Sequence, residues 1–297
     1  MVSTSACSSS TGPADSAGLS GSRRTEIEAM IRRRFAVRAF GRTKARPDHP
    51  GSTVMNDVVD LLTAHRSVRR FKSDPVPDKH LEAAVRAGQQ AATSSNIQAY
   101  AAIRITDPAV RDRLVSLTGG QEKVAACPLF LTICGDVRRH RLLAARANVT
   151  HASNLEGFML AVIDATLFAQ NMVVAFESMG YGTCYVGGLR NDLSALHEVL
   201  RTPAGVWPLF GLCVGTPDQD TSVRPRLAPR TVLFDDVYPD DDAVLAAVDD
   251  YDRTIADWYR ANGMKTPDWS SRIRRHFEEL HRTGNSAWYR GAGASFE

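Results

Sequence analysis

The run from Gly157 to Gly180 constrains the fold of this chain more than any other stretch, because it is apolar nearly all round. A surface helix buries one stripe, so a helix that is apolar on every side is either enclosed in a core or shared with a second chain. Asp164, Gln170, Asn171 and Glu177 interrupt the run before it reaches the length of a membrane span. We therefore expect the central helix of a soluble core and no membrane segment.

The charge balance and the cysteines exclude several kinds of site. Residues 1–53 hold nine of the 36 basic residues and four of the 33 acidic ones, which leaves 27 basic and 29 acidic residues in the rest of the chain. This balance gives no basic face for nucleic acid. The five cysteines form no CxxC pair and no histidines have metal-ligand spacing, so we expect no metal site. Four cysteines lie in apolar runs, which is typical of reduced, buried thiols in a cytoplasmic protein.

The chain divides into three parts by composition and pattern. Residues 1–53 are Ser-rich and then Arg-rich with few large apolar side chains, so we expect a disordered extension. Residues 54–285 contain the regular elements that the pattern predicts, and residues 286–297 form a C-terminal tail.

Short apolar strands alternate with helices in residues 54–285. The pattern predicts strands at residues 101–106, 129–134, 184–188 and 209–215, with a turn at Gly135-Asp136. It predicts helices near residues 55–62, 81–92, 108–118, 157–180, 191–201, 241–259 and 270–280, and leaves residues 137–155 without an assigned structure. Asp107-Pro108 is typical of a capped start for the third of these helices. Few strands among so many helices indicate an α+β sandwich rather than a barrel.

The first predicted helix leads into a basic cluster. Met55, Val58, Val59 and Leu62 have the spacing of one buried stripe, and the helix then delivers His65-Arg66-Ser67-Val68-Arg69-Arg70-Phe71 to its C-terminal edge. Cations suit that end of a helix dipole, and the cluster surrounds a hydroxyl, so it can bind an anion such as phosphate. The alternative is a solvated basic helix end.

Two glycine-containing sequences look like nucleotide-binding motifs but lack the structural context or the spacing that those motifs require. Gly180-Tyr181-Gly182 ends a helix instead of following a strand, and Gly119-Gly120-Gln121 lacks the spacing of a P-loop. What remains besides the basic cluster is a set of separated polar pieces: residues 93–98, Gln121, Gly187-Gly188, Arg224 and Arg226. A ligand with a phosphate at one end and a hydrogen-bonding ring at the other would use all of them.

These pieces resemble the nitroreductase family of FMN enzymes, and specifically its NADPH-dependent, oxygen-insensitive nitroreductase and flavin reductase branch. Seven motifs occur in the family's order between residues 55 and 285: His65-Arg66-Ser67-Val68-Arg69, Ile103-Arg104-Ile105-Thr106-Asp107, Leu117-Thr118-Gly119-Gly120-Gln121, Asp164-Ala165 with Ala169-Gln170-Asn171, Tyr185-Val186-Gly187-Gly188-Leu189-Arg190-Asn191, Pro208-Leu209-Phe210-Gly211-Leu212 and Arg224-Pro225-Arg226-Leu227. The resemblance implies an α+β, nitroreductase-like sandwich whose central, mostly antiparallel sheet is flanked by helices. It also implies a homodimer with two FMN sites at the interface, in which the helix of residues 157–180 is shared.

The resemblance further implies a set of cofactor-binding residues. His65, Arg66 and Ser67 are expected to hold the FMN phosphate with Arg224 and Arg226. The rest of the set is Arg69 by the ribityl chain and pyrimidine edge, Gln121 bonded to the flavin, Ser94 and Ser95 from a loop that closes the site across the interface, Tyr185, and the Gly187-Gly188 backbone near flavin N5. Two features depart from the family pattern, since Arg224 replaces a lysine and the loop of residues 93–98 is shorter.

A second set of residues is expected to select the nicotinamide cofactor. The resemblance implies that Arg260 and Lys265 bind the 2′-phosphate of NADPH, with Lys265 in place of an arginine. The alternative is an exposed helix end with solvated charges.

The implied activity is that of an NADPH-dependent FMN oxidoreductase with a ping-pong mechanism. Hydride passes from NADPH to the flavin and then to a nitroaromatic, a quinone or free flavin, and no side chain need act as an acid or base because the cofactor carries the chemistry. Two alternatives stay open from the sequence. One is different FMN chemistry on the same fold, such as reductive dehalogenation or flavin fragmentation, with residues 137–155 as a lid. The other is a flavin-binding redox sensor without catalysis.

Overall fold

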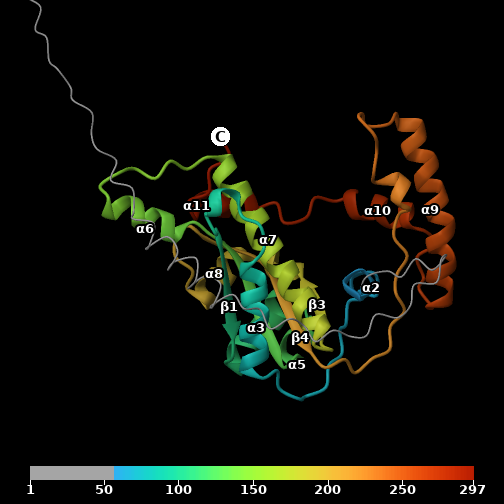
Figure 1. The fold of residues 1–297 in the computed structure, drawn as a ribbon, viewed down its shortest axis with the longest axis horizontal. Coiled ribbons are helices and arrows are strands. Elements are labelled where there is room, and N and C mark those ends of the chain that lie inside the picture. The colour runs from blue at the N-terminus through green and yellow to red at the C-terminus, as the bar shows by residue number, and fades with distance from the viewer. Residues whose placement is uncertain (1–56) are drawn as a thin grey trace, which may run out of the picture. The chain divides into compact units, whose positions relative to one another are not determined.

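A four-stranded antiparallel sheet organises residues 57–297, which are the part of the chain that this computed structural model describes (Figure 1). The predicted extension of residues 1–53 lies outside that range. The strands are β1 (Tyr100–Ile105), β2 (Leu129–Asp136), β3 (Gly182–Val186) and β4 (Val206–Gly215), in the order β1-β2-β4-β3. All three neighbouring pairs are antiparallel. The predicted α+β fold with a mostly antiparallel sheet is confirmed.

The predicted turn at Gly135-Asp136 is wrong, because both residues belong to β2. They pair with Trp207 and Val206 of β4. The Asp136 carboxylate accepts a hydrogen bond of 2.8 Å from the backbone N–H of Arg138, at the start of the helix that follows. Asp136, which suggested a turn, is therefore the last residue of β2, and its carboxylate also fixes the start of the next helix.

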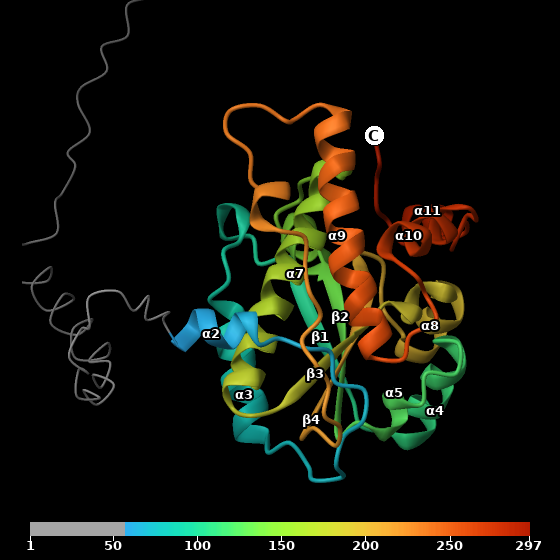
Figure 2. The same cartoon turned by 90° about the vertical axis from the view of Figure 1, so that its right-hand side faces the viewer.

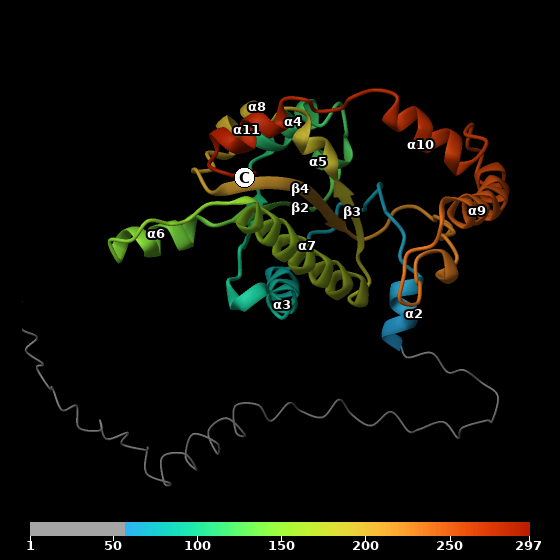
Figure 3. The same ribbon diagram turned by 90° about the horizontal axis from the view of Figure 1, so that it is seen from above.

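Helices α3 (Asp78–Gln89) and α7 (Leu155–Ser178) cover one face of the sheet (Figure 3). Phe168, Met172, Val173 and Phe176 of α7 are buried there among strand residues. The expectation that polar residues break α7 below the length of a membrane span is wrong, since the helix is long and apolar enough by length and composition. Its burial against α3 and the sheet makes it the core helix that the sequence predicts.

The opposite face is covered by α4 (Pro108–Leu117), α5 (Lys123–Ala126), α8 (Leu193–Leu200) and α11 (Asn285–Gly291) (Figure 3). Asp107 caps α4 as predicted, because its carboxylate accepts a 2.9 Å bond from the backbone N–H of Ala109. Tyr289 of α11 is buried, and its hydroxyl donates to the carbonyl of Pro208 over 2.9 Å. The C-terminal tail of residues 286–297 thus contributes to the core.

Helices α9 (Asp241–Ala261) and α10 (Trp269–Phe277) form a small core of their own (Figure 2). Tyr251, Ile255 and Tyr259 of α9 are buried, with Trp258 and Trp269 packed against them. The short helix η3 (Pro229–Thr231) lies in the chain that connects β4 to α9.

Two predicted features of the remaining helices need correction. Helix α2 (Asp57–Thr63) has no buried residue, and its Val59 and Leu62 side chains are 40% and 46% exposed. The predicted buried stripe is therefore wrong for a single chain. Helix α6 (Arg138–Arg146) occupies much of the segment that had no assigned structure, and short helices η1 (Ser94–Asn96) and η2 (Gly187–Asn191) complete the fold.

Candidate functional site

The basic segment after α2 is extended chain that crosses one end of the sheet. Ser67 forms a parallel bridge with Thr183 of β3, where the backbone N–H of Val68 donates to the Thr183 carbonyl over 2.9 Å. Further along, Phe71 bridges to Pro217, just after β4. Because both ends of the segment are fixed by backbone pairing, the cluster is not a solvated helix end.

One side chain joins the basic segment to the chain beyond β4. Oε1 of Gln219 accepts from the backbone N–H groups of Arg69 and Arg70, at 3.2 and 2.8 Å. Residues 219–226 therefore run beside residues 65–70. The five residues predicted to hold the phosphate all line one hollow there: His65, Arg66, Ser67, Arg224 and Arg226. Arg69, which the resemblance assigns to the ribityl chain and pyrimidine edge, lines the same hollow.

The hollow has a strong excess of positive charge. It is lined by four arginines and His65, against one carboxylate, that of Asp220. Burial lowers the pKa of the Arg224 guanidinium, and the charges of Arg272, Arg69 and Arg226 lower it further, although Tyr259 opposes them. A bound anion would relieve this repulsion. Within residues 57–297, no group of three or more metal-ligating side chains gathers anywhere.

Three buried polar atoms of residues that line the hollow lack a hydrogen-bond partner within residues 57–297. They are Nε of Arg224, Oγ1 of Thr221 and Nε1 of Trp258. A buried polar group without a partner is rare in folded proteins. Guanidinium and indole N–H groups are donors only, so the missing partner is an acceptor. The residues present therefore fit a phosphate ester such as that of FMN.

A second part of the site lies where α4 ends. Gly119 and Gly120 have φ angles of 77° and 75°, a left-handed conformation that favours glycine, and they turn the chain so that Gln121 faces η2. Nε2 of Gln121 donates to the carbonyl of Thr118 over 2.9 Å. A Cβ atom on Gly188 would lie 2.9 Å from that same carbonyl oxygen and would also overlap Gln121. The structure thus brings together Gln121 and Gly188, two of the residues that the resemblance assigns to the flavin.

Cations from both parts of the site affect the thiol of Cys184. Burial raises its pKa, while the charges of Arg69 and Lys123 oppose the rise. Arg69 lines the hollow, and Nζ of Lys123 donates to Oε1 of Gln121. Cations from both parts are therefore close enough to act on one buried thiol of β3.

Two family descriptions match this chain. The nitroreductase family matches residues 62–216, and the C-terminal domain of the nitroreductase family matches residues 224–295. The chain belongs to the nitroreductase family. The second match contains α9, which supplies Trp258 to the hollow, and Asn262, which follows the helix and lines the hollow too.

The match to named relatives covers nearly the whole length of those proteins. An FMN reductase (NADPH) of Bacillus subtilis is 39% identical over 236 residues, which is 77% of this chain and 94% of that protein. An oxygen-insensitive NADPH nitroreductase of Salmonella typhimurium is 39% identical over 224 residues, 74% of this chain and 91% of that protein. The solved structure of a B. subtilis nitroreductase has a TM-score of 0.77 and 36% identity, over 80% of this chain and 99% of that one. These relatives confirm the predicted family and branch.

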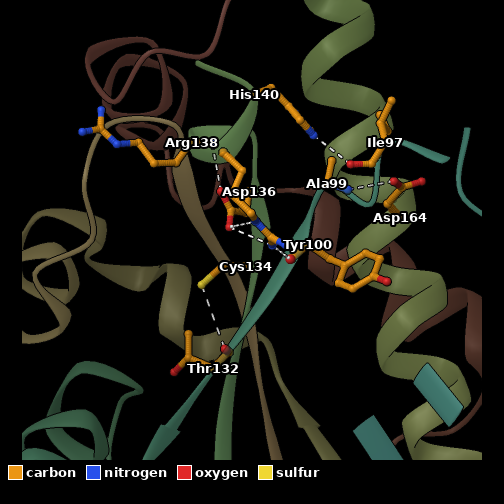
Figure 4. A network of polar contacts seen from close by, with 10 residues as sticks. Ile97, Ala99, Tyr100, Thr132, Cys134, Asp136, Arg138, His140 and Asp164 are labelled. Carbon is orange, nitrogen blue, oxygen red and sulfur yellow. Dashed lines mark hydrogen bonds and ion pairs between the residues drawn. The ribbon is translucent and has the colours of Figure 1, made fainter. Parts of the chain in front are cut away.

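The predicted serines lie on a loop outside the hollow of this nitroreductase-family chain. The Asp164 carboxylate of α7 fixes the loop by accepting from Oγ1 of Thr93 at 2.6 Å. It also accepts from the backbone N–H of Ala99 at 3.0 Å (Figure 4). Nε2 of His140 lies 2.7 Å from the carbonyl of Ile97 on the other side. Ser94 and Ser95 are exposed and do not line the hollow, so in a single chain the structure does not join them to the phosphate side.

Three further predicted residues are also outside the hollow. The Tyr185 hydroxyl donates to Gln170 of α7 over 3.3 Å, on the face of β3 that α7 covers. Arg260 forms an exposed ion pair of 2.7 Å with Asp257, and Lys265 is exposed beyond the end of α9. Their roles toward FMN and NADPH remain predictions.

Sequence reasoning missed five residues that line the hollow: Asp220, Thr221, Ser222, Trp258 and Asn262. Asp220, Thr221 and Ser222 form a short polar run directly before Arg224, a signal that could have extended the motif. Trp258 gave no such signal, because an aromatic residue in an amphipathic helix is usually a core residue.

Proposed function

We propose that this chain is an FMN-dependent oxidoreductase that transfers hydride from NADPH to FMN and then to a small-molecule acceptor, in a ping-pong sequence. The acceptor classes are nitroaromatics, quinones and free flavin. The observation that carries the proposal is the cationic hollow, which joins both predicted phosphate-binding motifs and contains buried donors without acceptors. The names of the relatives, FMN reductase (NADPH) and oxygen-insensitive NADPH nitroreductase, support it.

The protein's own residues bind, orient and tune the cofactor. When bound, FMN supplies the hydride chemistry. His65, Arg66, Ser67, Arg224 and Arg226 would hold its phosphate, because guanidinium groups match phosphate oxygens with paired hydrogen bonds. Fixed positive charge preorganised beside a group that gains negative charge stabilises the charged form.

The other half of the site would hold the ring. Arg69 would lie at the pyrimidine edge and supply that positive charge, and Gln121 would bond the ring. Gly187 and Gly188 have no side chain to obstruct a stacked substrate. The contact between Gln121 and Gly188 supports this arrangement, because it places an amide side chain beside the two glycines that follow β3.

The active form is proposed to be a cytoplasmic homodimer. Leu155, Met159, Ile163 and Leu167 of α7 are exposed large apolar side chains spaced four residues apart, so they form one stripe along the helix. Contiguous exposed apolar surface of this kind marks an interaction site. A second copy would cover the stripe and bring the partner's Ser94 and Ser95 to the flavin. The four described cysteines are free and buried, which suits a reducing compartment.

The test is a pair of measurements on purified protein. We expect a yellow protein whose FMN is bleached by NADPH in the absence of oxygen, and rapid NADPH oxidation when a quinone or nitroaromatic is added. Tight FMN binding without turnover would instead identify a redox sensor. Failure of the wild-type protein to bind FMN would refute the proposal.

A further inference from the structure

Trp258 is one of the five residues of the hollow that neither the sequence pattern nor the family motifs single out. Its indole Nε1 is buried and has no hydrogen-bond partner within residues 57–297. A buried donor without an acceptor carries a desolvation cost that a ligand can remove. Because an indole N–H is a donor only, the partner that it lacks is an acceptor.

The neighbours of Trp258 determine which acceptor fits. The guanidinium carbon of Arg224 lies 4.8 Å from the centre of the indole ring, a cation–π contact. Nε of Arg224 is a second buried donor without a partner, and Oγ1 of Thr221 is a third polar atom in the same condition. An acceptor that satisfies two donors and also compensates the surplus positive charge is a phosphate ester.

We propose that Trp258 donates its indole N–H to the phosphate of FMN and, through the face of its ring, holds Arg224 against the same phosphate. The inference rests on the proposed function, and it deepens the description of the cofactor site. It makes α9, which lies in the C-terminal domain of the family, a wall of the flavin site.

Phosphate groups of NADPH share this chemistry, so the choice of FMN needs an argument. Trp258 lines the same hollow as His65, Arg66 and Ser67, which the family motif assigns to the flavin phosphate. Arg260, the residue predicted to bind the 2′-phosphate, lies outside that hollow and is paired with Asp257. The geometry therefore favours the flavin.

The first experiment removes the N–H and keeps a ring over Arg224. Full-length Trp258→Phe and wild-type proteins are loaded with FMN or with riboflavin, which lacks the phosphate, and flavin fluorescence after serial dilution gives the dissociation constants. We expect Trp258→Phe to bind FMN about 10- to 100-fold more weakly and riboflavin equally well, from the usual strength of a hydrogen bond to a charged group.

Trp269→Phe is the matched control. Trp269 belongs to the same small core, with its ring centre 5.7 Å from that of Tyr251, and it does not line the hollow. The same chemical change there should leave both flavins bound as in the wild type. Melting temperatures of the two variants show whether either substitution disturbs the fold.

A second experiment on the wild-type protein does not depend on a variant that folds. The chain has four tryptophans, so four indole N–H signals are expected in a nitrogen-15 correlation spectrum. We expect the Trp258 signal, assigned from the variant or by elimination, to move on addition of FMN and to move much less with riboflavin.

Three results would overturn the proposal. Equal losses of FMN and riboflavin affinity would make Trp258 a structural residue. Unchanged FMN affinity, together with an indole signal that ignores FMN, would remove it from the phosphate site. Weaker binding of NADP⁺ to the loaded enzyme with unchanged FMN affinity would assign the donor to the nucleotide. If the wild-type protein binds no FMN, the proposed function itself fails.

Discussion

Nδ1 of His65 lies 2.8 Å from Oε1 of Glu177, and the same carboxylate oxygen accepts from the Thr183 hydroxyl over 2.9 Å. Glu177 is near the end of α7, Thr183 is in β3, and His65 begins the basic segment. One carboxylate therefore ties the core helix, the sheet and the phosphate-binding segment together.

Glu177→Ala should therefore loosen the phosphate side of the site. Removing one partner of a partly buried, charged hydrogen bond costs about 1–3 kcal/mol, so we expect that loss in urea unfolding and weaker FMN binding. Glu82→Ala is the control, because its 2.6 Å pair with Arg86 is exposed and such pairs contribute about 0–1 kcal/mol. Equal effects of the two substitutions would contradict this account.

Arg226→Ala should release FMN. Loss of a charge-assisted bond to phosphate costs about 1.5–3 kcal/mol, which equals a roughly 10- to 100-fold weaker dissociation constant. Arg230→Ala is the matched control, since Arg230 pairs with Asp250 over 3.0 Å and does not line the hollow. Flavin fluorescence on dilution measures both, and unchanged affinity in Arg226→Ala would show that the phosphate binds elsewhere.

Gly188→Ala and Gly187→Ala should differ sharply. A Cβ on Gly188 would meet the Thr118 carbonyl at 2.9 Å, whereas a Cβ on Gly187 would have its nearest neighbour, Nη2 of Arg190, at 3.5 Å. Overpacking a closely packed site costs about 1–3 kcal/mol, so we expect a lower melting temperature for Gly188→Ala alone. Gly187→Ala should keep its stability, and any loss of turnover there would report obstruction at the flavin.

Arg260→Ala tests the cofactor preference. The 2′-phosphate is the charged difference between NADPH and NADH. Loss of the contact between Arg260 and this phosphate should therefore raise KM for NADPH by roughly 10- to 100-fold and leave NADH kinetics unchanged. Arg253→Ala is the control, because that arginine also makes an exposed ion pair on α9, with Asp250. Similar losses with both nucleotides, or a wild-type preference for NADH, would remove Arg260 from nucleotide selection.

Tyr289 should make the fold sensitive to high pH. Burial raises its pKa to about 12 from the ordinary tyrosine value of 10.0. The folded state therefore keeps a proton that the unfolded state loses, so this contribution to stability is complete below pH 10 and is lost as the pH rises to about 12. The slope is about −1.4 kcal/mol per pH unit. Tyr289→Phe should show a shallower loss of stability over that range in urea unfolding, and an identical slope would contradict the assignment.

Much of the fold could be predicted because the signals are local. The Asp107 cap and the four strands depend on neighbours in sequence, and the structure confirms them. The exposed stripe of α2 could not be separated from a core stripe, because both have the same helical spacing. The turn predicted at Gly135-Asp136 was wrong for a related reason, because an acidic residue after an apolar run marks a turn or a helix start equally well.

The candidate site, like the fold, could be predicted from the sequence only in part. The motifs of residues 65–69 and 224–226 were identifiable as separate anion-binding pieces, and residues of both line one hollow in the structure. Trp258 was not identifiable, because its proposed role follows from a buried indole N–H without a partner and a contact with Arg224 that no spacing encodes.

The hollow also bears on how the protein is made. Ser67 and Trp258 face the same cavity although 191 residues separate them in the chain. Contacts between such distant segments close late, because a long loop must first lose its conformational entropy. A ribosome that has made the whole sheet has therefore not yet made a complete phosphate site. A product that ends before α9 lacks Trp258 and should fail to retain FMN; it also lacks α11, which covers one face of the sheet.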